Sequence, residues 1–228
     1  MLFGHGMPFP TLPPICVIGT KCVTLPAKPK PRQMENILTA VTEADLAAAV
    51  TDERGVKYSP DGLRLLKAPE ELLGNYAIKP GTKVICGEAF DACAVTDITI
   101  PDSVTSMGSG AFLCCSSLSS IKIPYGVAII ENRAFMWCLS LASILIPDSV
   151  TVIGSYAFRK CRSLKSINIP DSVTSIGKSA FWGCSSLNSI IIPDSVTSIG
   201  SGAFVGCYSL SGDTKAEIRR RFGQQPFE

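Results

Sequence analysis

Cysteines at a nearly constant spacing are the residues in this sequence whose type could do chemistry. Six of them each follow a phenylalanine by three residues: Cys93, Cys115, Cys138, Cys161, Cys184 and Cys207. A column of thiols could ligate metal ions, form disulfides or fill a core. Metal sites favour a C-x-x-C spacing, which the sequence lacks, whereas stacked turns would lie close enough for disulfides. We prefer a small apolar side chain repeated in the core, with Cys114 turned outward as the more reactive thiol.

Aspartates and the single histidine suggest two further kinds of site. Asp102, Asp148, Asp171 and Asp194 recur in register and could bind cations, although aspartate is more often a turn-forming residue in such a place. The only histidine, His5, lies in a proline-rich stretch, so no nucleophile in the repeats has a histidine base. We therefore expect no catalytic residues, no metal site and no cofactor, and we predict that the chain is not an enzyme.

The composition limits the partners of the chain. Of 228 residues, 46% are hydrophobic and 18% are charged, which is enough to bury a core. The formal net charge is +2 without a block of like charges, so we predict no nucleic-acid binding, and the arginines at 219–221 suit a helix end. Apolar runs fall short of the roughly 18 residues of a membrane helix, so we predict no membrane insertion. The first residues, without Lys or Arg before Lys21, do not resemble a secretory signal.

An internal repeat positions these residues. The phenylalanines that precede the cysteines are separated by 22, 23, 23, 23 and 23 residues; they are Phe90, Phe112, Phe135, Phe158, Phe181 and Phe204. Seventeen residues before each of them stands another apolar residue: Leu73, Val95, Leu118, Leu141, Leu164 and Leu187. One such turn cannot bury its apolar side alone, so the repeat predicts six stacked turns with a shared core. At about 4.8 Å per turn the stack would be roughly 25–30 Å long.

Each turn has a predicted local structure. The Ile-x-Ile alternation predicts a short strand with one buried face, which the following Pro-Asp-Ser ends in a turn. The chain then returns under the core, where Gly108, Gly154, Gly177 and Gly200 are predicted to supply positive φ. The A-F-x-x-C segment is predicted to form one helical turn.

The form I-P-x-x-V-x-x-I-G-x-x-A-F-x-x-C-x-x-L closely resembles the repeats of the BspA-like leucine-rich-repeat family, over about residues 71–211. The resemblance implies an α/β-type repeat solenoid, a right-handed leucine-rich-repeat coil with a parallel sheet on one face and short helical turns opposite. It also implies a protein without catalysis. Better-known members are surface proteins that adhere to host matrix proteins such as fibronectin and fibrinogen.

The residues before the repeats are predicted to form two parts. Residues 1–33 are a Pro-rich leader, expected to be extended and disordered. Residues 34–69 are predicted to cap the first open end of the solenoid. A helix is predicted over 34–50, with a local restart where Asp45 follows Thr42, and then a hairpin around the S-P-D-G turn.

The repeats occupy residues 70–211, and residues 212–228 are predicted to form a capping helix at the second end. Thr214 with Glu217 has the spacing of a capping box, and Gly223 is a suitable stop. The predicted solenoid therefore has helical caps at both ends.

The solvent side of the predicted strands is the candidate binding surface. Its side chains lie thirteen and fifteen residues before a repeat phenylalanine: Asp97, Thr99, Ser120, Lys122, Ser143, Leu145, Ser166, Asn168, Ser189 and Ile191. Solenoids commonly bind along such a face. We therefore predict a monomeric protein–protein interaction module, which the family resemblance implies is a surface or secreted adhesin. The lack of an evident signal peptide favours the alternative, an intracellular repeat scaffold without an adhesive role.

Overall fold

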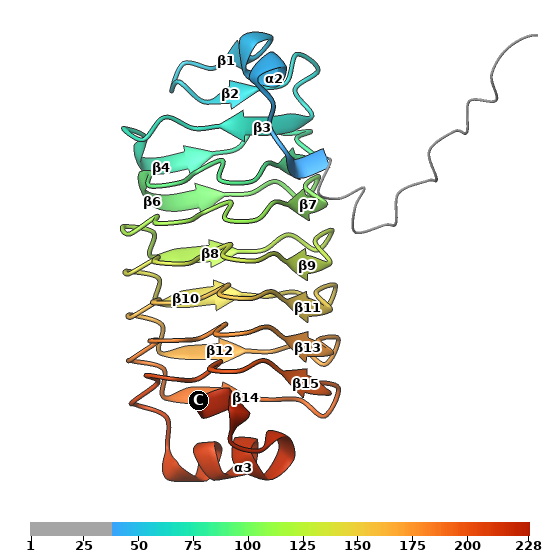
Figure 1. The fold of residues 1–228 in the computed structure, drawn as a ribbon. Helices are drawn as coiled ribbons and strands as arrows, with labels where there is room; N and C mark the ends of the chain where they lie inside the picture. The colour runs from blue at the N-terminus through green and yellow to red at the C-terminus, as the bar shows by residue number, and fades with distance from the viewer. Residues whose placement is uncertain (1–37) are drawn as a thin grey trace, which may run out of the picture.

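The repeats stack into one column, as the spacing of the phenylalanines predicts. The computed structural model describes residues 38–228, so the predictions for the leader and for His5 lie outside the described residues. Successive turns of the chain lie one beside the next, from an N-terminal cap to a C-terminal cap (Figure 1). The predicted fold class, a repeat solenoid with a parallel sheet along one face, is confirmed.

The Ile-x-Ile segments form a parallel sheet along the column, with strand pairing among its first four strands and between its last two. Its strands are β4 (Leu73–Ala77), β6 (Ala94–Thr99), β8 (Ser120–Lys122), β10 (Ser143–Leu145), β12 (Ser166–Asn168) and β14 (Ser189–Ile191). Equivalent positions pair, as Ile121 does with Ile144, and β12 continues the stack beside β10 (Figure 1). Because side chains alternate along a strand, the central isoleucine of β8, β12 or β14 is buried and its neighbours face solvent.

A second set of parallel strands runs along the column, and after its first strand the sequence predicts only a returning segment there. These strands are β3 (Arg64–Lys67), β5 (Val84–Ile85), β7 (Ser106–Met107), β9 (Ile129–Ile130), β11 (Val152–Ile153), β13 (Ser175–Ile176) and β15 (Ser198–Ile199). Ile153 pairs in register with both Ile130 and Ile176. Strands of two residues carry almost no local signal, because their pairing is imposed by the stacking of the turns.

The glycines that follow these strands are required by space, and the predicted positive φ is wrong for them. Gly108, Gly154, Gly177 and Gly200 are not among the positive-φ residues. A Cβ at Gly177 would lie 2.4 Å from the backbone nitrogen of Ser155 in the preceding turn. Glycine is needed here because a larger residue would push adjacent turns apart.

Each A-F-x-x-C segment is a tight turn, but it does not form regular helix. The residue two positions after the phenylalanine has a left-handed backbone, with φ 66° at both Trp137 and Lys160, which interrupts a right-handed helix. Amides bond to the next turn of the solenoid instead. Phe135 N donates to Ala157 O at 2.8 Å, and Trp137 N donates to Arg159 O at 2.8 Å. The segment is thus a third line of hydrogen bonds between turns.

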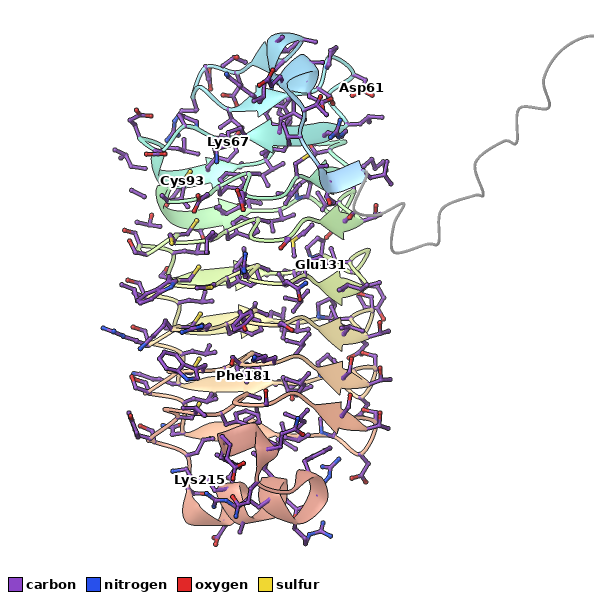
Figure 2. All side chains as sticks on the ribbon, in the orientation of Figure 1. Asp61, Lys67, Cys93, Glu131, Phe181 and Lys215 are labelled. Atoms are coloured by element: carbon purple, nitrogen blue, oxygen red, sulfur yellow. The ribbon has the colours of Figure 1, made fainter. Side chains whose placement is uncertain are left out.

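A column of phenylalanine rings fills the core. The six repeat phenylalanines are at most 1% exposed, and neighbouring ring centroids lie 5.2–5.5 Å apart with planes within 12° of parallel. Phe181 lies inside the column among the other apolar side chains (Figure 2). The prediction for Leu73 is wrong: it is 65% exposed, and Leu72 is buried in its place. The pairing of β4 with β6 shifts register between Gly74 and Asn75, next to this residue.

The N-terminal cap contains a short helix and an antiparallel hairpin. The helix α2 (Glu43–Ala47) begins after Thr42, whose side chain accepts a hydrogen bond from Asp45 N at 3.0 Å, as the predicted local cap requires. The single helix predicted over 34–50 is wrong in its described part, because Thr42 is extended and Val50 lies in β1 (Val50–Thr51). β1 pairs with β2 (Lys57–Tyr58), and β2 pairs with β3 in the predicted hairpin.

The C-terminal cap begins with the predicted helix. It is α3 (Gly212–Phe222), and the predicted stop, Gly223, has φ 73° at its end. The predicted capping box is wrong: Ser211 is extended, precedes the helix and accepts a hydrogen bond from Thr214 N at 3.1 Å. Glu217 instead pairs with Arg220 one turn later on the helix surface.

The residues after α3 form a further layer that the sequence did not predict. They make the short 3₁₀ helix η1 (Gln225–Phe227). Phe204 N donates to Pro226 O at 2.8 Å, as a repeat phenylalanine donates to the alanine of the next turn. The Phe227 ring lies 6.0 Å from that of Phe204 and extends the ring column. The segment therefore covers the last repeat by imitating part of another one.

Candidate functional site

All ten predicted binding residues lie on the strands of the first sheet and form what we call the strand face. By repeat position they make two rows. The first row holds Asp97, Ser120, Ser143, Ser166 and Ser189, and the second holds Thr99, Lys122, Leu145, Asn168 and Ile191. All are exposed except Ser120, which is half-buried. The alternation of side chains along each strand therefore turns the predicted residues to solvent together.

The two rows differ in chemistry. The first row consists mostly of serines, which can donate and accept hydrogen bonds but carry little apolar surface. The second row contains two large apolar side chains, Leu145 at 60% exposed and Ile191 at 75% exposed. Leu145 pairs with Lys122, and Ile191 with Asn168, so each apolar residue has a polar neighbour. Asn168 of β12 lies between them in the row, so Leu145 and Ile191 are two separate apolar positions on a polar face.

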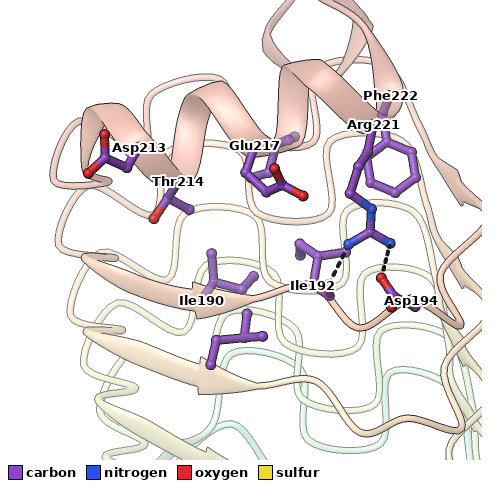
Figure 3. A pocket seen from close by; sticks show the side chains of 10 residues that line it. Ile190, Ile192, Asp194, Asp213, Thr214, Glu217, Arg221 and Phe222 are labelled. Atoms are coloured by element: carbon purple, nitrogen blue, oxygen red, sulfur yellow. Dashed lines mark hydrogen bonds and ion pairs between the residues drawn. The ribbon is translucent and has the colours of Figure 1, made fainter.

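A pocket of 420 Å³ lies at one end of the strand face, between β14 and α3. Ile190, Ile191 and Ile192 line it from the sheet, and Ile218 and Phe222 line it from the helix (Figure 3). Asp213, Thr214 and Glu217 add polar groups along the helix. The pocket thus continues the apolar surface that begins at Ile191.

Arg221 fixes one wall of this pocket. Its guanidinium donates to Ile192 O at 2.6 Å and to Pro193 O at 2.9 Å, and lies 3.8 Å from Asp194 (Figure 3). Pro193 O also accepts the backbone amide of Val196 within its own turn, so the arginine adds charge-assisted hydrogen bonds that tie α3 to the turn after β14. The sequence did not reveal the pocket, because it forms between a cap and the last strand, which share no repeat pattern.

The cysteine column lies in the core, away from the strand face. Each thiol donates to the phenylalanine carbonyl of the preceding turn at 3.0–3.1 Å; the donors are Cys115, Cys138, Cys161, Cys184 and Cys207. All eight cysteines in the described part are free thiols. The thiol therefore donates a hydrogen bond in addition to filling space. Its acceptor is a buried phenylalanine carbonyl, which also accepts a backbone amide from the same turn as that phenylalanine.

Burial raises the pKa of every described cysteine. Desolvation raises the pKa of Cys93 to about 11 and that of Cys207 to about 12. Deeper in the column, burial holds the pKa of Cys161 and Cys184 well above its usual range. These thiols stay protonated near neutral pH, and a protonated thiol is a poor nucleophile and metal ligand. Cys114, the predicted reactive thiol, is half-buried, and desolvation raises its pKa as well.

The aspartates predicted as turn-forming residues do not gather into a site. Asp102, Asp148, Asp171 and Asp194 are all exposed. Within residues 38–228, no group of three or more His, Cys, Asp or Glu side chains is placed to hold a metal ion. The same residues contain no helix long and apolar enough to span a bilayer.

Comparison with known proteins gives the relatives of this fold. A family described as "BspA type Leucine rich repeat region" matches residues 77–211 in six copies. The leucine-rich-repeat protein TpLRR of T. pallidum is 29% identical with a TM-score of 0.59, over 72% of this chain and 90% of that one. A leucine-rich-repeat protein from Bacteroides ovatus is 35% identical with a TM-score of 0.57, over 71% of this chain and 43% of that one.

A third solved structure shares the fold at lower identity. The pneumococcal vaccine antigen PcpA is 19% identical with a TM-score of 0.58, over 79% of this chain and 47% of its own. This chain thus spans less than half of the B. ovatus and pneumococcal chains. No curated protein matches the chain. The six family copies cover more than half of the 228 residues, and the chain belongs to the BspA-type leucine-rich-repeat family.

Proposed function

We propose that this chain is a non-enzymatic protein–protein interaction module that binds its partner along the strand face. The observation that carries the proposal is the pair of large apolar side chains, Leu145 and Ile191, held at 60% and 75% exposure on a rigid sheet. Each could bury its apolar surface against a partner, and burial of apolar surface is worth about 25 cal/mol per Å². A sheet pays little conformational entropy on binding because its strands are already ordered.

The pocket beside α3 supports the same function. It opens next to Ile191 and is lined by five apolar residues, so a partner side chain could enter it while the partner main chain lies along the sheet. The serine row beside it would contribute hydrogen bonds. The two features together make an anchor point at one end of an otherwise shallow surface.

More specifically, we propose that the chain is a surface or secreted adhesin that binds a host or matrix protein. We call this the adhesin form of the proposal, and the family resemblance supports it. An intracellular repeat scaffold is the second candidate, favoured by the eight free thiols of the described residues, because disulfides are rare where thiols stay reduced. Fractionation of the source cells with thiol counting separates the two: reduced protein confined to the cytosol ends the adhesin form.

The strand face is tested by surface plasmon resonance with the full chain immobilised and fibronectin or fibrinogen in solution. We expect binding of at least one of them, and a loss of about tenfold or more when Leu145 and Ile191 are both replaced by Glu, because each charge would have to be desolvated in the interface. The matched control is Tyr125→Glu, at a side chain that is 68% exposed but outside both rows.

Two results would count against the proposal. No binding of either matrix protein would reject the adhesin form and leave the scaffold form to be tested. For that form, proteins captured from a lysate of the source cells are compared between the natural chain and the Leu145→Glu, Ile191→Glu variant. A captured protein that binds both equally well would show that the strand face is not the interface.

A further inference from the structure

One turn of the solenoid differs from the others in its charge. After Phe158 the chain reads R-K-C-R-S-L-K, whereas the next turn reads W-G-C-S-S-L-N after Phe181. All the positions that vary between these two turns are basic in the first of them. We call this set, with one arginine of the preceding turn, the basic edge: Arg133, Arg159, Lys160, Arg162 and Lys165. It lies outside both rows of the strand face.

The charges of the basic edge are not balanced within the described part of the protein. The ion pairs there are Arg64 with Asp45, Arg220 with Glu217, and Arg221 with Asp194, and none includes a basic-edge residue. Arg159 also makes no side-chain hydrogen bond there, although its Nε is buried. Arginine forms strong charge-assisted hydrogen bonds with carboxylates, so a guanidinium without an acceptor in the protein favours a ligand carboxylate at its terminal nitrogens.

Aromatic side chains hold two of these cations in place. Lys160 Nζ lies 4.1 Å from the ring centroid of Trp182 and 5.8 Å from that of Trp137, the two tryptophans of the chain. The Arg159 guanidinium lies 4.4 Å from Trp182 and 5.6 Å from the ring of Tyr156. These contacts restrict the rotamers of long side chains and so lower the entropy lost when they bind an anion.

A hollow of 320 Å³ opens beside these cations. Leu113 and Met136 provide its apolar lining, and Arg133, Tyr156 and Arg159 complete it. Its size suits one large apolar side chain. Two arginines line the same hollow. A ligand would therefore bind more tightly if carboxylates flanked the side chain that enters the hollow.

We propose that the basic edge binds an acidic polypeptide segment, with one apolar side chain in the hollow and carboxylates on Arg133, Arg159 and Lys160. A sulfated polysaccharide would match the charges but has no apolar side chain for the hollow. A nucleic acid needs open aromatic faces for its bases, and the Trp182 ring is already in contact with two cations of the protein. This surface is additional to the strand face and does not depend on it.

Fluorescence anisotropy with the full chain tests the proposal. The probe is a short labelled peptide of Glu and Asp residues with one central Phe. We expect saturable binding that weakens with added salt. We also expect about a tenfold loss of affinity in the double variant Arg133→Ala, Arg159→Ala, and a similar loss in Lys160→Glu. The matched control, Lys122→Ala, removes a basic residue of the strand face and should change affinity less than twofold.

Further probes decide the class of ligand. The same peptide with Gly in place of Phe should bind about tenfold more weakly, because it leaves the hollow empty. Equal binding of the two peptides, or tighter binding of heparin or of a single-stranded oligonucleotide, would overturn the proposal. The Leu145→Glu, Ile191→Glu variant should bind the probe as the natural chain does, so failure here is distinguishable from failure of the strand-face function.

Discussion

Phe158 shows at the residue scale why this repeat has to be repeated. Its ring has no exposed surface and lies 5.5 Å from Phe135 and 5.3 Å from Phe181, in the turns before and after it. No turn could bury its own phenylalanine without these neighbours. The spacing of the phenylalanines was enough to predict this arrangement, because residues at equivalent positions of stacked turns share the same environment.

Replacing Phe158 by Ala should lower the free energy of unfolding by about 3–5 kcal/mol. The substitution leaves a cavity that the rings of the adjacent turns cannot move in to fill. Urea denaturation followed by circular dichroism measures this change. Tyr208→Ala is the control, at a side chain that is 82% exposed, and should change stability by less than about 0.5 kcal/mol. A loss below about 1 kcal/mol for Phe158→Ala would place the ring outside the core.

The buried cysteines make stability depend on pH in the alkaline range. Below about pH 8.5 the thiols are protonated in both the folded and the unfolded chain. Above that pH the unfolded chain loses protons, while burial keeps Cys161 and Cys207 protonated through their raised pKa. Stability therefore falls as pH rises, by about 1.4 kcal/mol per pH unit for each buried thiol, until the pH passes the folded-state pKa.

We expect this slope to be smaller in the variant Cys161→Ala, Cys207→Ala. Urea denaturation at several values between about pH 8.5 and pH 10.5 measures the slope for the variant and the natural chain. Cys114→Ala is the control, because this half-buried thiol should affect the slope less. An identical slope in the double variant would show that these two thiols ionise in the folded protein.

The hydrogen bonds of the thiols could not be predicted from the sequence. Spacing placed the cysteines in the core, but the bond from Cys161 Sγ to Phe135 O depends on the offset between one turn and the next. The same is true of Gly177, whose lack of a Cβ is explained only by the closeness of Ser155. Sequence patterns report which residues face inward and not how far apart successive turns lie.

At the scale of elements, the last segment of the cap has a testable structural role. Gly202 N donates to Gln225 O at 2.9 Å and Phe204 N to Pro226 O at 2.8 Å. Deleting residues 224–228 should therefore speed hydrogen exchange at these two amides, because each would lose its acceptor. Exchange at the Phe112 amide, which donates to Ala134 O, should stay as it is. Equal protection of Gly202 and Phe204 with and without the segment would mean that η1 does not cover the last repeat.

The elements divide into those with a local signal and those without one. The strands of the first sheet could be predicted because Ile-x-Ile alternates, and the hairpin because S-P-D-G defines a turn. β11 and β13, with two residues each, could not be predicted, because a pair of residues carries no periodicity. The same limit applies to η1, whose Pro226 and Phe227 match the repeat only after they are folded against Phe204.

At the scale of the whole molecule, stacking turns a weak local pattern into a continuous surface. A three-residue strand presents at most two side chains to solvent, such as Ser189 and Ile191 of β14. Aligned strands present two long rows, which is the geometry that a binding face requires. The sequence predicted which residues form these rows. It did not predict the pocket against α3, because the cap and the last strand share no register. It did not predict the basic edge either, because the charges of one turn depart from the repeat pattern.

The stack also makes each turn an interchangeable unit. Residues 170–192 make up one complete 23-residue period, and their removal joins Ile169 to Pro193, so that every later residue keeps its place in the repeat. Removal of residues 173–192 instead takes out 20 residues and breaks the period. The two deletions are matched in position and similar in size, but only the first preserves the stacking register.

Urea denaturation of these two deletion variants tests whether the turns are interchangeable. We expect the variant lacking 170–192 to fold, to unfold cooperatively and to have an m-value lower by about a tenth, because less surface is exposed on unfolding. We expect the variant lacking 173–192 not to unfold cooperatively. If the in-register deletion proved as disruptive as the out-of-register one, the turns would not be interchangeable layers of one core.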